Sequence, residues 1–160
     1  MPEIHLAPYT AADHDWLVAQ HQVLYAQSEG FDETFGPLVD GILTDFEDQS
    51  DPNFEQGWIA YAGDQRVGSI FCVKLDANIA KLRMFLLLPE ARGKGIGKQL
   101  LSQCMSFAKE RGFARMTLWT HESHTAACAL YARFGWSCTS SDPVVSFGVS
   151  LIEQQWEIAL

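Results

Sequence analysis

The sequence predicts an α/β or α+β fold built on one mixed sheet. Segments of strand character alternate with segments of helical character along the 160 residues. Two of the strands, expected at 57–62 and 66–75, flank a Gly63-Asp64-Gln65 turn that is typical of a hairpin. A basic, glycine-rich turn separates an apolar strand expected at 79–88 from an amphipathic helix. These observations favour strands and helices packed together in one sheet.

The chain before the hairpin predicts one strand and two helices. Polar and apolar residues alternate in the strand, whereas both helices carry apolar residues at helical spacing. Gly30 and Gly36 indicate a turn between the helices, over 25–36. The strand is expected at 3–8, the first helix from about Ala11 to residue 24, and the second helix at 37–46, with Pro37 in its first turn.

The chain after the glycine-rich turn predicts two helices and three strands. Gly112 and Gly135 are suited to end the two helices, since glycine readily adopts the left-handed conformation of a C-terminal cap. The helices are expected at 95–111 and 125–134, a strand at 116–120, and a pair of strands in the last twenty-odd residues.

The glycine-rich turn has the chemistry of a site for a polyanion. Glycines let the backbone turn sharply and approach a ligand, and the first turn of the following helix offers unpaired N–H groups and a positive dipole end. Arg92, Lys94 and Lys98 add three positive charges.

Two common phosphate-binding motifs do not match this turn. A P-loop requires Lys followed by Ser or Thr at the end of its pattern, but Lys98 is followed by Gln99. A dinucleotide fingerprint requires G-x-G-x-x-G and an acidic residue about twenty positions later, and the chain has Gly93, Gly95 and Gly97 with no acidic residue at 112–116. Nucleoside triphosphate hydrolysis and dinucleotide binding are therefore disfavoured.

The pattern Arg92-x-x-Gly95-x-Gly97 resembles the pyrophosphate loop of the GNAT superfamily of acyl-CoA-dependent N-acyltransferases. Residues 80–89 resemble the central strand of that family, and residues 130–136, LYARFGW, resemble its LY-x-x-x-GF segment. The C-terminal segment, from Ser146-Phe147-Gly148 through Trp156-Glu157-Ile158, further resembles the acetyltransferase half of fusions between a MarR-type regulator and a GNAT domain.

The resemblance implies a single N-acetyltransferase domain over residues 1–160. Its sheet would be mixed, mostly antiparallel and twisted, flanked by helices, with two central parallel strands that splay apart. Acetyl-CoA would be the co-substrate, and its acetyl group would pass to a primary amine of a small molecule, an amino acid or a polyamine, by direct attack in a ternary complex. A non-catalytic acyl-CoA-binding or regulatory module and a protein N-acetyltransferase are the alternatives.

The resemblance also assigns residues to the cofactor. Main-chain groups of the splayed strand would hold the pantetheine and polarise the thioester carbonyl, the glycine loop would bind the pyrophosphate, and His124 stands where many family members carry an Asn that bonds the cofactor. The expected cofactor-binding residues are Phe85, Leu86, Leu87, Leu88, Arg92, Gly93, Lys94, Gly95, Ile96, Gly97, Lys98, His124 and Tyr131.

Tyr131 is the main candidate for a catalytic residue, because a phenol can protonate the departing thiolate. It also belongs to an i, i+3, i+4, i+7 apolar pattern that is typical of a core-facing helix. Glu29 is the candidate general base, and could equally anchor the positive charge of the substrate. Tyr25 and His121 are candidate substrate-binding residues on the acceptor side.

The charges are unevenly distributed. Thirteen of the twenty Asp and Glu residues, and no Lys or Arg, lie in the first 65 residues, whereas five of the eleven Lys and Arg residues lie within 81–98. This pattern suits an anionic cofactor and a cationic amine on opposite sides of a cleft, or simply a solvated acidic surface. A net charge of −9 disfavours nucleic acid as a partner. Exposed Trp or Phe side chains would suit a homodimer, and are equally consistent with core residues.

The remaining composition indicates a cytoplasmic protein. No apolar run approaches the length of a membrane span, and the N-terminus lacks a signal-peptide pattern. The four cysteines contain no C-x-x-C pair, so we expect buried thiols and neither a metal site nor a disulfide framework.

Overall fold

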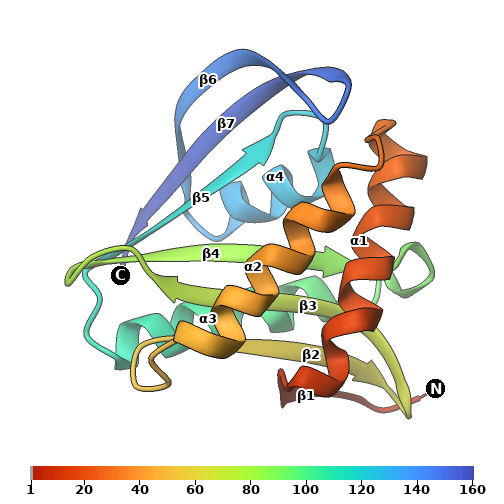
Figure 1. Cartoon of the computed structure of the whole chain (residues 1–160). Helices are drawn as coiled ribbons and strands as arrows, with labels where there is room; N and C mark the ends of the chain where they lie inside the picture. Colours follow the sequence, from red (N-terminus) through yellow and green to blue (C-terminus); the bar gives the residue numbers. More distant parts are fainter. Residues whose placement is uncertain (1) are drawn as a thin grey trace.

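The structure is a computed structural model that describes residues 2–160. Seven strands form one sheet in the order β1-β2-β3-β4-β5-β7-β6, and every neighbouring pair is antiparallel except β4 and β5, which are parallel (Figure 1). The mixed α/β fold predicted from the sequence is thereby confirmed. The strands are β1 Ile4–Pro8, β2 Gln56–Ala62, β3 Gln65–Lys74, β4 Ile79–Leu87, β5 Arg115–His121, β6 Ser137–Ser146 and β7 Val149–Ala159.

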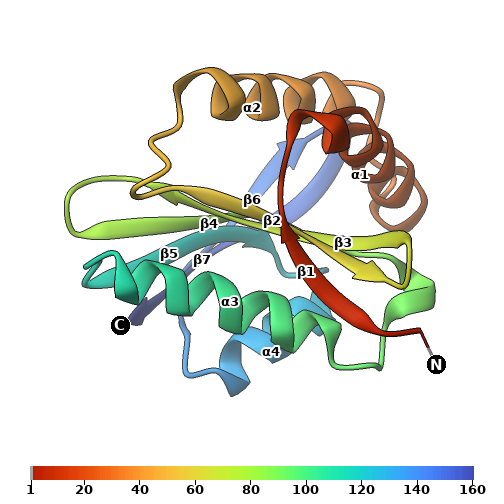
Figure 2. The ribbon, with the colours of Figure 1, turned by 90° about the horizontal axis from the view of Figure 1, so that it is seen from below.

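Four α-helices cover the two faces of the sheet. α1 and α2 lie on one face, and α3 and α4 lie on the other (Figure 2). The bounds are α1 His14–Glu29, α2 Phe35–Gln49, α3 Ile96–Glu110 and α4 Thr125–Arg133, with short 3₁₀ helices at Ala11–Asp13 and Pro89–Ala91.

Each face of the sheet has its own hydrophobic core. The core on the α3 and α4 side contains fully buried residues such as Leu100 and Met116. The core under α1 and α2 contains Leu17, Leu43 and Phe71. Each fully buried aliphatic side chain stabilises the fold by about 1.5–3 kcal/mol relative to exposure, so the two cores together hold the helices against the sheet.

The prediction of a turn over 25–36 is wrong for residues 25–29, which belong to the C-terminal end of α1. The helix ends at Gly30, whose φ of 75° is the left-handed conformation of a C-cap and whose N–H donates to the carbonyls of Ala26 and Tyr25. α2 begins at Phe35, two residues earlier than predicted, after an Asp32 carboxylate that accepts the N–H of Thr34 at 3.0 Å. These local hydrogen bonds decide the boundaries, and apolar spacing alone does not reveal them.

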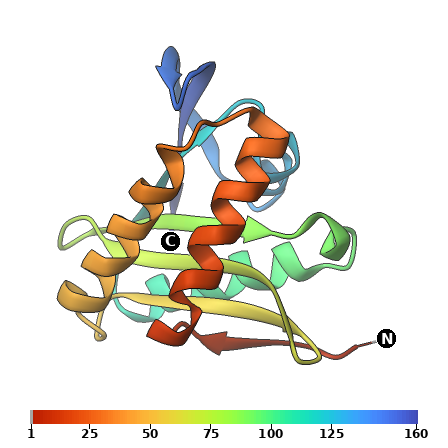
Figure 3. The ribbon, with the colours of Figure 1, turned by 45° about the vertical axis from the view of Figure 1, so that its right-hand side comes forward.

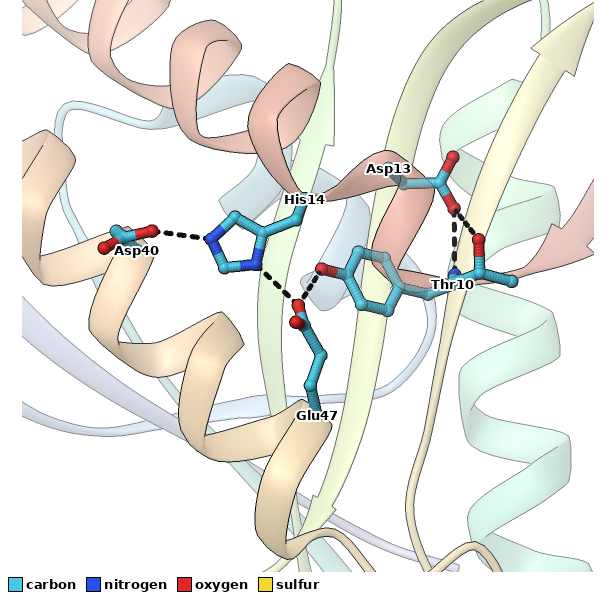
Figure 4. Close-up of polar contacts among 6 residues, drawn as sticks. Thr10, Asp13, His14, Asp40 and Glu47 are labelled. Carbon is cyan, nitrogen blue, oxygen red and sulfur yellow. Dashed lines mark hydrogen bonds and ion pairs between the residues drawn. The ribbon is translucent and has the colours of Figure 1, made fainter.

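His14 ties α1 to α2 across the face of the sheet (Figure 4). Its Nε2 atom lies 2.6 Å from Asp40 Oδ1, and its Nδ1 atom lies 2.5 Å from Glu47 Oε2. The hydroxyl of Tyr9 donates to the same Glu47 oxygen at 2.6 Å. The hydrogen bonds to Asp40 and Glu47 raise the pKa of His14 above its usual value of 6.5. The network fixes the angle between the two helices that cover this face of the sheet.

The β6–β7 hairpin rises beside the helical layer (Figure 3). Phe147 and Gly148 form its turn, with φ values of 53° and 76° as a tight hairpin turn requires. The carbonyl of Phe147 accepts the N–H of Asp32 at 2.9 Å, so the tip of the hairpin is bonded to the α1–α2 loop. Segments about 115 residues apart in sequence therefore meet over one end of the sheet.

The cysteines differ in exposure. Cys72 and Cys104 are buried as predicted, Cys128 is partly buried and Cys138 is exposed. The prediction of a buried thiol is wrong for Cys138, because this residue lies on the edge strand β6. Within residues 2–160, no cluster of His, Cys, Asp and Glu has a geometry that could hold a metal ion. None of the helices over this range combines the length and apolarity that crossing a bilayer would require.

Candidate functional site

The two central parallel strands separate after a short paired segment. β4 and β5 pair only from Ile79 with Arg115 to Lys81 with Thr117. Both strands continue beyond these residues, to Leu87 and His121, without pairing to each other. Figure 1 shows the two strands diverging from their paired end. The edge of β4 that faces β5 therefore offers backbone groups that no neighbouring strand occupies.

A β-bulge lies in the unpaired half of β4. The register with β3 shifts between Ser69 and Phe71, and Met84 has a φ of 52°, which is unusual for a residue other than glycine. The hydroxyl of Ser69 donates to the Met84 carbonyl at 2.6 Å and holds this conformation. Leu82 before the bulge packs in the core on the α3 side, whereas Leu86 after it packs under α1 and α2. The bulge therefore shifts the alternation of β4 by one residue, so that even-numbered side chains face α3 before it and face α1 and α2 after it.

The glycine-rich loop follows directly at the end of β4. Gly93 and Gly95 have φ values of 77° and 78°, and a Cβ atom at either would meet no atom within 4 Å. The space beside the loop is therefore open, and the two glycines are needed for the backbone conformation. α3 begins at Ile96, so the first N–H groups of this 15-residue helix have no intrahelical acceptor. The loop thus combines open space, unpaired N–H donors and three exposed cations, and this combination suits a pyrophosphate. The cations are Arg92, Lys94 and Lys98.

Tyr131 lies in the core on the α4 side, 3% exposed. Its ring centroid is 6.1 Å from that of Phe85 and 5.7 Å from that of Trp136. Burial is the main cause that raises the pKa of Tyr131 well above 10, so the hydroxyl stays protonated at neutral pH and retains its proton to donate. The contact with Phe85 joins Tyr131 to the unpaired half of β4.

A polar group lies where the end of α1 meets the end of β5, and it consists of Tyr25, Glu29, His121 and His124. Glu29 is the last residue of α1, and its Oε1 atom lies 3.3 Å from Nε2 of His124, at the distance of an ion pair but without the orientation of a hydrogen bond. The rings of Tyr25 and His124 lie 5.1 Å apart. His121, at the end of β5, lies 5.5 Å from His124 between ring centroids. The four side chains come from two segments that are distant in sequence, the end of α1 and the end of β5 with the turn that follows it.

Burial is the main influence on the pKa values of His121, His124 and Tyr25. It lowers the pKa of His121 and of His124 below 6.5, although Glu29 acts in the opposite direction on both. Both imidazoles are therefore neutral at physiological pH and can accept a proton. Burial, with a contribution from Glu29, raises the pKa of Tyr25 to about 12, and Arg92 of the glycine loop opposes this shift. The positive charge of Arg92 therefore also acts on the Tyr25 side chain.

Thr120 orients the His124 ring. The Thr120 hydroxyl lies 3.2 Å from Nδ1 of His124. When that hydroxyl accepts a hydrogen bond from Nδ1–H, Nε2 is the nitrogen that is free to take up a proton. An imidazolium formed in this way has its new charge beside the Glu29 carboxylate.

A cluster of three phenylalanines packs beside Tyr25 and His121. Phe31, Phe35 and Phe147 pack against one another with ring centroids 4.8–5.0 Å apart. Phe31 also lies 5.5 Å from Tyr25 and 5.8 Å from His121. The turn at Phe147 therefore packs, through Phe31, beside Tyr25 and His121. Sequence reasoning assigned no role to Phe31, Phe35 or Phe147 as site residues.

The fold agrees with the comparisons to known proteins. The sequence profile described as "Acetyltransferase (GNAT) family" matches residues 14–136. Since this match covers most of the chain, the protein belongs to the GNAT acetyltransferase family, and the resemblance to the GNAT superfamily is confirmed. The further resemblance to fusions with a MarR-type regulator stays a prediction.

Curated relatives match over shorter stretches. A mycothiol acetyltransferase from Salinispora arenicola is 33% identical over 76 residues, which are 47% of this chain and 21% of that protein. An uncharacterized N-acetyltransferase of Escherichia coli, YjgM, is 38% identical over 60 residues, which are 38% of this chain and 36% of that protein. The matched part is about a fifth of the length of the mycothiol acetyltransferase.

Solved structures share the fold along the whole chain. A GNAT-family acetyltransferase from Staphylococcus aureus has a TM-score of 0.78 at 21% identity, with 99% of both chains covered. An acetyltransferase from Salmonella typhimurium, solved with its cofactor acetyl-CoA, has a TM-score of 0.75 at 18% identity and covers 98% of this chain and 94% of that one.

Proposed function

We propose that this protein transfers the acetyl group of acetyl-CoA to a primary amine of a small molecule, by direct attack in a ternary complex. The observation that carries the proposal is the separation of β4 from β5 beyond Lys81 and Thr117, with the glycine loop at the end of β4. This arrangement suits a thioester inserted along β4 with its pyrophosphate at the loop. Membership of the GNAT family and the acetyl-CoA bound to the Salmonella typhimurium structure support the same co-substrate.

In the proposed reaction, the amine nitrogen forms a bond to the acetyl carbonyl carbon and the carbon–sulfur bond breaks. Backbone N–H groups along Phe85–Leu87 would stabilise the negative charge that develops on the carbonyl oxygen, whereas the N–H of Leu88 already donates to the Val67 carbonyl at 2.9 Å. His124 would take the proton lost by the amine, with Glu29 stabilising the imidazolium. Tyr131 would return a proton to the departing thiolate.

A panel of amines tests this function. Acetyl-CoA consumption is followed with diamines, amino acids, a peptide with a free N-terminus and a peptide containing lysine. Turnover with small amines supports the proposal, whereas acetylation of peptides alone would favour a protein N-acetyltransferase. Binding of CoA with no turnover on any amine would contradict the proposed reaction and favour a non-catalytic acyl-CoA-binding module.

Arg92→Ala is the matched variant for the cofactor side of the proposal. Loss of one of the three loop cations is expected to weaken acetyl-CoA binding roughly tenfold, because charge-assisted contacts to phosphate are the strong ones. Arg133→Ala removes an exposed cation from α4 and serves as the control.

A further inference from the structure

Two cationic side chains of β4 lie on the acceptor side of the sheet. Lys81 and Arg83 are both partly buried. Ala80 and Leu82 alternate with them and pack into the opposite core, on the α3 side. Arg83 lies opposite Phe71 of β3, which belongs to the core under α1 and α2, and residues paired across two strands share a face. Both positive charges therefore face the side of the sheet that α1 and α2 border.

Neither cation forms an ion pair with a carboxylate of residues 2–160, since the pairs found there involve other residues. Burial lowers the pKa of both side chains, and the more distant carboxylates of Asp45, for Arg83, and Glu153, for Lys81, compensate only in part. A cation removed from water without a partner is costly. The two side chains therefore have unused capacity to bind an anion.

The two cations also lie where β4 and β5 separate. Lys81 and Thr117 are the last paired residues, so Arg83 lies in the diverging part of β4. Trp119, two residues after Thr117 on the same face of β5, is 52% exposed, and its ring centroid is 6.0 Å from Nζ of Lys81. A large exposed aromatic surface next to the Lys81 cation suits an organic chain that ends in an acidic group.

We infer that the acceptor amine carries an oxyanion, either a carboxylate or a phosphate, which Arg83 and Lys81 bind while the amine reacts. This inference rests on the proposed N-acetyltransferase function and identifies its class of substrate. A strand rises about 3.3 Å per residue, so Arg83 and Lys81 lie roughly 7 and 13 Å along β4 from Phe85. The acceptor is thus an amino acid or amino phosphate with a spacer of similar length, in contrast to a polyamine.

Four compounds with the same six-carbon chain test the inference. They are aminohexanoate, aminohexyl phosphate, the uncharged analogue aminohexanol and the cationic analogue diaminohexane. The kcat/KM of each is measured for the wild type and for Arg83→Gln and Lys81→Gln, which remove the charge and keep a polar side chain. Lys109→Gln is the matched control, because Lys109 is an exposed cation on α3, on the other face of the sheet.

We expect the wild type to prefer aminohexanoate or aminohexyl phosphate over aminohexanol by tenfold or more. The preferred member of the pair identifies a carboxylate or a phosphate as the anion. Each site variant is expected to reduce that preference roughly tenfold through KM, as loss of a charge-assisted contact does, and Lys109→Gln is expected to leave it intact. Equal or better use of diaminohexane and aminohexanol, or a preference that neither site variant changes, would overturn the inference.

A binding measurement separates this inference from the proposed function. Calorimetry with aminohexanoate and aminohexyl phosphate in the presence of CoA reports the anion site without turnover. If no amine is acetylated but one of these compounds binds and Arg83→Gln weakens its binding, the reaction is wrong and the anion site stands. If amines are acetylated but the site variants change neither binding nor selectivity, the proposed reaction stands and the anion site is wrong.

Discussion

The Nε2 atom of His124 lies 3.3 Å from the Oε1 atom of Glu29, and both side chains are largely buried, with 18% and 10% of their surfaces exposed. The contact joins the turn after β5 to the last turn of α1. A neutral imidazole in this position can take a proton from a substrate, because the imidazolium that forms has its charge beside the Glu29 carboxylate.

Glu29→Gln should move the acidic limb of the kcat/KM profile to lower pH. Activity requires neutral His124 and falls when the ring is protonated, and Glu29 raises the pKa of that ring. Removal of the carboxylate therefore lowers the pKa further. His124→Gln should remove the limb and reduce kcat/KM roughly a hundredfold. A pH–rate profile measures both effects, with Glu33→Gln in the exposed α1–α2 loop as the control; an unmoved limb in Glu29→Gln would argue against the pair.

Tyr131→Phe should reduce kcat roughly tenfold or more while leaving KM for acetyl-CoA and the free energy of unfolding nearly unchanged. The ring retains its packing against Phe85 and Trp136, and only the proton donor to the thiolate is lost. Steady-state kinetics and urea unfolding provide the two readouts. An unchanged kcat would assign Tyr131 to the core alone.

Gly95→Ala should weaken acetyl-CoA binding at least tenfold and cost about 1–2 kcal/mol of stability, because the residue has a φ of 78°. Gly41→Ala is the control. Gly41 lies inside α2, and a Cβ there would meet nothing within 4 Å, so alanine should stabilise the helix by about 0.5–1 kcal/mol. Calorimetric titration and urea unfolding distinguish the two variants. Wild-type affinity in Gly95→Ala would exclude the loop as the pyrophosphate site.

Acid should destabilise the protein through His21. Complete burial lowers its pKa to about 4, against 6.5 when unfolded. The neutral form is therefore required for folding, and its contribution is complete above pH 6.5 and declines as the pH falls toward 4. The loss amounts to roughly 3 kcal/mol. His21→Asn should flatten the stability curve over this window, as measured by urea unfolding at a series of pH values. The same slope in wild type and variant would contradict this prediction.

His14 should act in the opposite direction. Its folded-state pKa is raised by Asp40 and Glu47, so the protonated form stabilises the fold. This contribution is present in full below the unfolded pKa of 6.5 and is lost as the pH rises through the raised value. Asp40→Asn should lessen the decline of stability above pH 6.5. Thermal unfolding from neutral to alkaline pH measures the change; a steeper decline in the variant would show the linkage to be wrong.

The sequence predicted the fold through features that are local. Three such features are the alternation of strands and helices, the hairpin at Gly63-Asp64-Gln65 and the loop from Arg92 to Gly97. Each depends on neighbouring residues and can be predicted without knowing the distant contacts. The sequence did not predict the helix boundaries around Tyr25 and Glu29. These boundaries depend on the Gly30 cap, at which α1 ends, and on the Asp32 side-chain hydrogen bonds, after which α2 begins.

The acceptor side could not be derived from the sequence in the same way. Glu29, His121 and His124 were candidates as separate polar residues, and their mutual contacts depend on how α1 packs against the end of β5. Phe147 was known only as part of a C-terminal pattern, and Lys81 and Arg83 only as part of a basic stretch. Their surroundings come from a hairpin turn and a β-bulge that bring distant segments together.

By itself, the sequence determined the position of the glycine-rich loop, the alternation of elements and the family, because glycine conformation and hydrophobic periodicity act over a few residues. Only the tertiary structure decided which side chains share the acceptor side, which histidines are neutral and which cations lack a partner. Those properties arise from burial and from distances between segments, and neither is encoded at any one position of the chain.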